Sequence, residues 1–510
     1  MRRIFSLHLL IAGGLIGTLT GCSPKDQTKE QTETASRGSD TATADTLHPN
    51  AVNAGPIALT TTSDEAKALY TRGRALADQL RFHDARKLFE QAAAKDPSFA
   101  LAHYDLALTS PTPGQFLEHV NQAVALSSKA SNGERLMILA LQAGLNGDSK
   151  KSLEYSEELA AKYPHDARAQ VLLAVGYSGL QQYDKEVDYL TKAINDNPDY
   201  APAYNLLGYA YMPQGKYAEA EKAFKKYIEL VPNDPNPYDS YAEMLMRTGR
   251  FDESIVQYRK ALSIEPHFSN SYIGIATNLM FQGNYDAAAA QAQKLHDAAR
   301  DDGDRRVAIQ SRAMTFADQG KTARASQELD KLYALDAKIG DTTAMSVDAG
   351  LMGDVLLGSG QADDAAKRYQ QSLALIQSSS VSADLKDIAT LAGRYNVARV
   401  ALAKHNLPAA KAAAEEYRGG AEATHDAARI RLAHELAGTI ALEEKDFDKA
   451  NVELAQADQQ DPYILYTMAV AYQGKGDAAK TKELAKRSTE LRTFPTIRSS
   501  LVRTKAIKLM

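Results

Sequence analysis

The sequence predicts an all-α protein, an α-solenoid (superhelix) of about twelve antiparallel helix pairs, preceded by a signal peptide and a disordered tether. The main observation is a period of about 34 residues, which places Pro164, Pro198, Pro232 and Pro266 in one register. Within each period apolar residues recur at helical spacing, and hydrophobic residues make up 44% of the 510 residues. Such helix pairs bury their apolar faces by stacking on their neighbours.

Residues 1–21 have the pattern of a lipoprotein signal peptide. Two arginines precede an apolar run from Ile4 to Leu19, which is too short to span a membrane comfortably. The run ends in Leu-Thr-Gly-Cys22, which resembles a bacterial lipobox, where the cysteine is lipidated and becomes the new N-terminus. Cys22 is the only cysteine of the chain, so a chance cysteine behind an ordinary signal is the weaker alternative. The resemblance predicts a lipid anchor at Cys22.

The residues after the cysteine bear on location. In Gram-negative lipoproteins that resemble this one, aspartate after the cysteine tends to retain the protein at the inner membrane. Ser23 therefore favours the outer membrane, facing the periplasm. The rest of the segment 22–62 is rich in Thr, Ser, Ala, Asp and Pro without any period, which predicts a disordered linker with a reach of about 35 Å.

Residues 202–231 show the pattern of one helix pair. Both expected helices carry apolar residues at positions i, i+3, i+4 and i+7. The small Gly208 allows the two helices to approach closely. Gly215 in the turn can adopt a positive φ, and Pro232 ends the second helix because proline cannot continue the hydrogen-bond ladder.

This pattern resembles the tetratricopeptide repeat family. The residues that carry the resemblance are Gly208, Tyr211, Ala220, Phe224 and Pro232, and the same frame recurs from about residue 63 to the C-terminus. The resemblance implies a solenoid with a concave binding surface lined by the first helix of each pair.

The repeats divide into a regular block and a divergent block. Spacing is regular over 63–299 and lengthens over 300–494, with a charged stretch at 297–306 between the blocks. The motif Ser-Pro-Thr-Pro-Gly (110–114) is expected to shorten the first helix of the second unit. Residues 495–510 are predicted to form a C-terminal capping helix whose arginines and lysines stay in water.

A second stripe on the first helix of each pair is predicted to face a partner. Met212, Met246 and Met280 follow the repeat period, and methionines beside tyrosine and acidic groups make an adaptable surface for a peptide or helix. The alternative is that these methionines fill space between helices. Pro213 is expected to end or bend its helix just beyond Met212. The predicted groove residues are Asn205, Tyr209, Met212, Asp239, Glu243, Met246, Ile273, Thr277 and Met280.

The charge of this groove predicts the chemistry of its ligand. The stripe offers Asp239 and Glu243 and no lysine, so it is expected to repel a carboxylate and to accept apolar anchors with basic residues. The net charge of the chain, −5, lacks the basic footprint of a nucleic-acid-binding protein.

No residue pattern indicates catalysis, a cofactor or a metal. The sequence has neither a G-x-S-x-G nor an H-E-x-x-H motif, and the histidines are scattered. The predicted function is therefore a membrane-anchored scaffold that is not an enzyme and that binds other envelope proteins or their peptide segments. The alternative is a lipoprotein that binds a solute or peptide for delivery. The sequence leaves the partner, the envelope process and the oligomeric state open.

Overall fold

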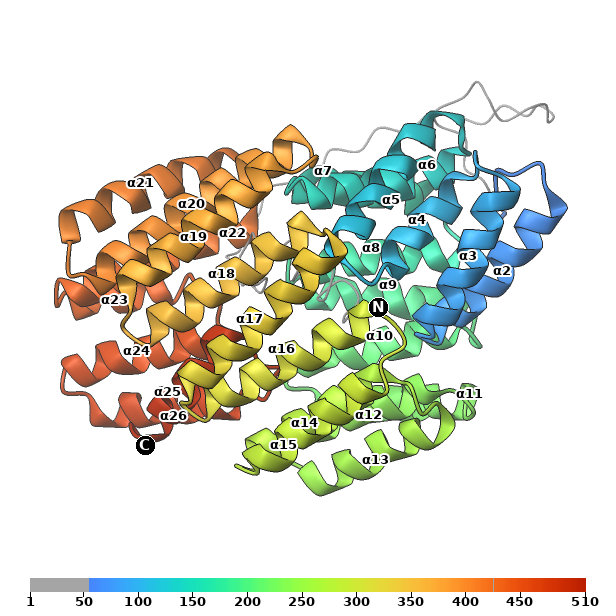
Figure 1. Cartoon of the computed structure of the whole chain (residues 1–510). Coiled ribbons are helices and arrows are strands. Elements are labelled where there is room, and N and C mark those ends of the chain that lie inside the picture. The colour runs from blue at the N-terminus through green and yellow to red at the C-terminus, as the bar shows by residue number, and fades with distance from the viewer. Residues whose placement is uncertain (1–54, 425) are drawn as a thin grey trace, which may run out of the picture.

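The computed structural model describes residues 55–424 and 426–510, which form twelve antiparallel helix pairs and one further helix (Figure 1). The predicted all-α solenoid is confirmed. The signal peptide, Cys22 and residues 23–54 lie outside the described residues. The first seven pairs are α2 (Asp64–Asp78) and α3 (Phe82–Lys95), α4 (Ala100–Thr109) and α5 (Pro113–Leu126), α6 (Asn132–Leu145) and α7 (Ser149–Lys162), α8 (Ala167–Gly179) and α9 (Tyr183–Asp196), α10 (Ala201–Tyr211) and α11 (Tyr217–Leu230), α12 (Pro235–Arg247) and α13 (Phe251–Ile264), and α14 (Ser269–Phe281) and α15 (Tyr285–Asp297).

The divergent half continues the same architecture with longer elements. Helices α16 to α22 have 17 to 21 residues, whereas α2 to α15 have 10 to 15. The longer spacing in the sequence therefore reflects longer helices. The elements are α16 (Asp302–Asp318) and α17 (Thr322–Ile339), α18 (Thr342–Gly358) and α19 (Ala362–Ser378), α20 (Ala383–Ala403) and α21 (Leu407–Thr424), α22 (Ala427–Glu443) and α23 (Phe447–Leu454), α24 (Pro462–Gly474) and α25 (Ala478–Glu490), and finally α26 (Ile497–Ile507).

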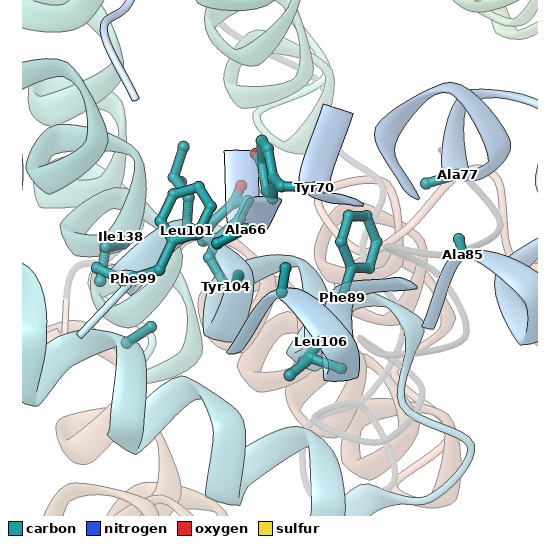
Figure 2. Close-up of a cluster of buried hydrophobic side chains, with 14 residues drawn as sticks. Ala66, Tyr70, Ala77, Ala85, Phe89, Phe99, Leu101, Tyr104, Leu106 and Ile138 are labelled. Atoms are coloured by element: carbon teal, nitrogen blue, oxygen red, sulfur yellow. The ribbon is translucent and has the colours of Figure 1, made fainter. Parts of the chain in front are cut away.

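Small residues let the two helices of a pair touch, as predicted. The ring of Phe224 on α11 lies directly on Gly208 of α10, where a Cβ atom would come within 2.6 Å of two ring carbons. The same contact, with the same separation in sequence, recurs between Gly73 and Phe89 and between Gly353 and Tyr369. Figure 2 shows one resulting core, in which Phe89 and Tyr70 lie among the buried residues of the first two pairs.

The turns follow the predicted chemistry. Gly215 adopts φ +71° after the first helix of its pair. Gln181, one period earlier, takes the same left-handed conformation at φ +57° without being glycine. Pro213 ends α10 as predicted: the α-helix stops at Tyr211, and a 3₁₀ turn covers Met212–Gln214. Helix α4 is the shortened helix expected before Pro111.

The last part of the predicted disordered linker is ordered, which corrects that prediction for residues 55–62. Ile57 is buried against Leu136 and Leu159. Its amide donates to Asp166 at 2.8 Å, and the amide of Thr60 donates to Glu134 at 2.9 Å. A lone isoleucine in a polar run has no periodicity, so its packing partner is visible only in the tertiary structure.

Helix α26 does more than cap the end of the solenoid. It packs on α24 and α25, its sequence neighbours, and also on α16 and α18, far back along the chain (Figure 1). Two of its arginines are largely buried in ion pairs: Arg498 with Glu435, and Arg503 with Asp318. The prediction that these arginines stay in water is wrong, because they meet carboxylates held by other repeats. Within the described residues no helix is both long and apolar enough to cross a membrane.

Candidate binding site

The superhelix encloses a cavity of about 730 Å³ between its two halves. Its lining residues come from α3 to α9, from α10, α12, α14 and α16, from the starts of α22 and α24, and from the segment before α26. Most of the large side chains in the walls are apolar, and they include Leu80, Tyr104, Leu108, Phe116, Leu141, Leu172, Val175, Val307, Met314 and Phe494. A cavity of this size and character suits a ligand held mainly by apolar contact.

The structure brings five of the nine predicted groove residues to this cavity: Tyr209, Glu243, Ile273, Thr277 and Met280. They come from α10, α12 and α14, the first helices of three successive pairs. The repeat period presents one helix face again in each pair, so the sequence could place these five residues on a common surface. Whether they contact a partner remains a prediction.

The other four predicted residues lie within the packing between helices. Met212 and Met246 are 3% and 0% exposed, which fits the alternative that they fill space between helices. Asp239 is 1% exposed and accepts a hydrogen bond of 2.8 Å from Ser271 on the next pair. Asn205 is also buried. Burial does not separate the two groups, since Met280 at the cavity is itself 1% exposed and also fits the space-filling alternative. Of the nine residues only Ile273 is partly exposed.

Glu243 is the acidic residue among the five predicted residues at the cavity, and two side chains donate hydrogen bonds to its carboxylate. The hydroxyl of Tyr209 donates to one carboxylate oxygen at 2.9 Å, and Arg247 donates to the other at 2.9 and 3.1 Å. The expected repulsion of a ligand carboxylate stays a prediction, but its basis is weaker than the sequence suggested. Glu243 carries its own cation, and Asp239 does not line the cavity.

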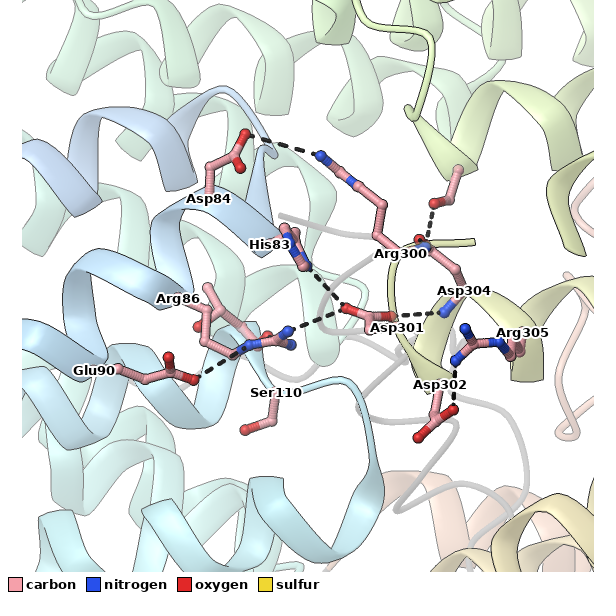
Figure 3. A network of polar contacts seen from close by, with 12 residues as sticks. His83, Asp84, Arg86, Glu90, Ser110, Arg300, Asp301, Asp302, Asp304 and Arg305 are labelled. Atoms are coloured by element: carbon pink, nitrogen blue, oxygen red, sulfur yellow. Dashed lines mark hydrogen bonds and ion pairs between the residues drawn. The ribbon is translucent and has the colours of Figure 1, made fainter. Parts of the chain in front are cut away.

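A second cluster of polar side chains at the cavity connects the first helix pair to the start of α16. Arg86 and His83 on α3 both reach Asp301, at 3.1 and 3.4 Å (Figure 3). Burial alone would raise the pKa of Asp301, but the amide of Asp304 and the charge of Arg86 outweigh it and lower that pKa. The sequence marked 297–306 only as a charged stretch. The partners of Asp301 lie far away in the chain, in the first helix pair, and no local pattern indicates them.

Further contacts close the superhelix on itself around the cavity. Ser149 donates to Asp426 at 3.0 Å, and Asn146 donates to Asp384 at 2.8 Å. On the apolar side, Phe116 of α5 belongs to one buried cluster with Leu385 and Ile388 of α20. The early pairs thus touch the first helices of pairs in the divergent half. The concave side is therefore partly enclosed rather than an open groove.

The described residues contain no group of three or more His, Cys, Asp or Glu side chains that could hold a metal ion. Several polar groups at the cavity form ion pairs with one another, such as Glu243 with Arg247 and Asp301 with Arg86. The arrangement can therefore hold and orient a ligand by apolar burial and hydrogen bonding.

These features define a helical-repeat protein with an interior cavity, and comparison with known proteins specifies the repeat. Residues 70–109, 201–234 and 236–268 match models of the tetratricopeptide repeat, so the chain contains repeats of this type. Such repeats generally mediate protein–protein interactions, and their fold is typically a non-catalytic scaffold. No curated protein matches the chain in sequence.

Solved structures show the same helical repeat. A tetratricopeptide repeat protein of Parabacteroides merdae is 16% identical over 56% of this chain and 99% of its own, with a TM-score of 0.35. One from Thermus thermophilus is 24% identical over 42% of this chain and 98% of its own, with a TM-score of 0.28. YrrB, described as having an unusual peptide-binding site, is 16% identical over 38% of this chain and 97% of its own, with a TM-score of 0.25. At these identities the likeness concerns the repeat alone.

Proposed function

We propose that the protein is a lipid-anchored scaffold of the bacterial cell envelope that binds segments of partner proteins inside its superhelix and performs no catalysis. The observation that carries this proposal is the cavity, which is lined in part by residues of α10, α12 and α14. Apolar walls supply the binding free energy, at roughly 25 cal/mol for each Å² of apolar surface removed from water. The Tyr209–Glu243–Arg247 group supplies a fixed polar contact that orients the bound segment.

One feature favours a second candidate, a lipoprotein that binds a solute or short peptide for delivery. The early pairs close on α16, α20 and α22, which leaves a bounded cavity in place of a long groove. Its volume of about 730 Å³ lies in the range of pockets for small ligands. A short linear segment of a partner fits the same space, so the size of the bound ligand distinguishes the two candidates.

Replacing Ile273 by arginine tests binding at the cavity. Ile273 lies at the cavity and is only half-buried, so a longer charged side chain enters the ligand space without breaking the core. We expect the recovery of cross-linked partners from cells to fall at least about tenfold, the loss that about 1.4 kcal/mol of binding free energy causes.

The matched control is Val256→Arg on α13, the same kind of change at a position that is 57% exposed. This variant should recover partners as the wild type does. Equal recovery with Ile273→Arg, with both variants folded by circular dichroism, would refute binding at the cavity. Recovery of a low-molecular-weight ligand in place of a protein from the purified wild-type chain would favour the delivery function.

The anchor is tested separately by metabolic labelling with palmitate. Wild-type protein should incorporate label and sediment with membranes, whereas Cys22→Ser should do neither, because the thiol that accepts the lipid is gone. Separation of inner and outer membranes then tests the outer-membrane location predicted from Ser23. Equal labelling of both proteins would end the lipid-anchor proposal and leave the cavity proposal intact.

A further inference from the structure

Helix α26 is held on the concave side of the divergent half in the manner of a bound ligand. The segment that joins it to α25, residues 491–496, is not helical. Its buried apolar residues are Ile497, Val502 and Ala506, and Ile497 packs in the core cluster of α16, α17 and α18. The preceding pairs pack one on the next in sequence order, whereas α26 packs on α25 and also on α16, α18 and α24.

Arg498 anchors one side of α26. Its guanidinium donates to Glu435 on α22 at 2.5 Å and to the hydroxyl of Tyr395 on α20 at 2.9 Å. The ring of Tyr463 on α24 lies 4.3 Å from the guanidinium carbon, close enough for a cation–π contact. Three different helix pairs therefore contribute to one arginine pocket.

Arg503 anchors the other side, since residues five apart point about 140° apart around a helix. It donates to Asp318 at the end of α16 at 2.5 and 2.7 Å. It also reaches the hydroxyl of Tyr285 at 3.0 Å and the carbonyl of Met280 at 3.2 Å, so it bridges the two halves of the superhelix.

The two carboxylates require such a partner. Glu435 and Asp318 are 4% and 1% exposed, and an unpaired charge at that depth is costly. In the described part of the chain, each of them forms its ion pair with α26. The surface is therefore complementary in charge to a helix with two arginines, a pattern that a partner protein can also present.

We propose that the surface around Asp318 and Glu435 is a docking site for an amphipathic helix with arginines five residues apart, that α26 is its occupant within the chain, and that a partner helix with this pattern displaces α26. The inference rests on the proposed function only in that the superhelix binds protein segments. The surface adjoins the cavity, because Thr496 and Ser499 line the cavity and Arg503 contacts Met280. Its tests use variants and peptides of α26, so their outcome is read independently of Ile273→Arg.

Titration of the full chain with a labelled synthetic peptide of residues 495–510 tests the proposal by fluorescence anisotropy. In the Arg498→Gln/Arg503→Gln chain the resident helix is weakened, and the peptide should bind saturably. The wild-type chain should bind it at least about tenfold more weakly, because its site is free only in a small fraction of molecules.

The control is a matched pair of peptides. A peptide with Gln at 498 and 503 should lose binding, whereas one with Gln at the exposed Lys505 and Lys508 should keep it, although both lose two charges. Equal binding of the two Gln peptides to the folded variant would overturn the proposal, and so would the absence of binding by the wild-type peptide.

Hydrogen exchange on the wild-type chain gives a test that requires no variant. If α26 leaves its site as a unit, its amides should exchange at least about tenfold faster than those of α16 and α18, through a local opening. Exchange of all three helices at the same rate would show that α26 is an integral part of the fold and would also overturn the proposal.

Discussion

Replacing Gly208 by alanine should destabilise the protein by about 1–3 kcal/mol, although alanine is the better helix former. The added methyl group would lie 2.6 Å from two carbons of the Phe224 ring. The ring cannot retreat, because Phe224 is fully buried and forms an edge contact with Tyr209, with ring centroids 5.3 Å apart. Thermal unfolding followed by circular dichroism, or the urea midpoint, measures the loss.

The matched control is Gly419→Ala in α21. There an added Cβ would meet no heavy atom within 4 Å, and the residue is helical and exposed. This substitution should stabilise the protein by about 1 kcal/mol, the helix-propensity difference between the two residues. Comparison of the two substitutions separates the effect of close packing from the effect of helix propensity. A gain of stability at both positions would contradict the role assigned to the small residue of each repeat.

Replacing Arg306 by methionine should cost about 3–5 kcal/mol at pH 8, because it leaves two buried carboxylates without their cation. Arg306 of α16 contacts Asp336 of α17 and lies 3.5 Å from Asp348 of α18. Both aspartates are fully buried. The three residues lie on three successive helices. Their ion pairs therefore fix the packing of the eighth helix pair (α16 and α17) against the ninth (α18 and α19).

The loss should be smaller at acidic pH, and the sign follows from Asp348. Burial raises the pKa of Asp348 to about 7, while the charge of Arg306 acts to lower it. A carboxyl whose folded-state pKa exceeds its unfolded value, about 3.9, binds its proton more readily in the folded state. Its contribution to stability is therefore fully present when the pH is below the unfolded-state pKa. That contribution is lost as the pH rises through the folded-state pKa.

Removing Arg306 raises the folded pKa of Asp348 further, so the variant should lose stability more steeply than the wild type between pH 5 and pH 8. Melting temperatures at the two pH values measure this effect. Adding Asp348→Asn to the variant removes one titrating group and should flatten the dependence. A variant whose deficit is the same at both pH values would contradict the assignment.

A small part of the candidate cavity, five of its lining residues, could be predicted because the repeat presents the same helix face in each pair. One helical face recurs in every repeat, so the sequence places Tyr209, Glu243 and Ile273 on a common surface. How deeply each of these side chains is buried was not predictable from the sequence. Met246 and Met280 have the same register and are both buried, at 0% and 1% exposed, yet only Met280 lines the cavity.

The sequence by itself determined the all-α class, the number of helix pairs, the close approach of two helices at Gly208 and the end of α10 before Pro213. These features depend on neighbours within one or two repeats, where periodicity and backbone chemistry act directly. Only the tertiary structure decided that the superhelix closes through Arg86 and Asp301 and that Arg498 is buried against Glu435. Such contacts depend on the small rotation from each pair to the next, accumulated over many repeats, which no local pattern specifies.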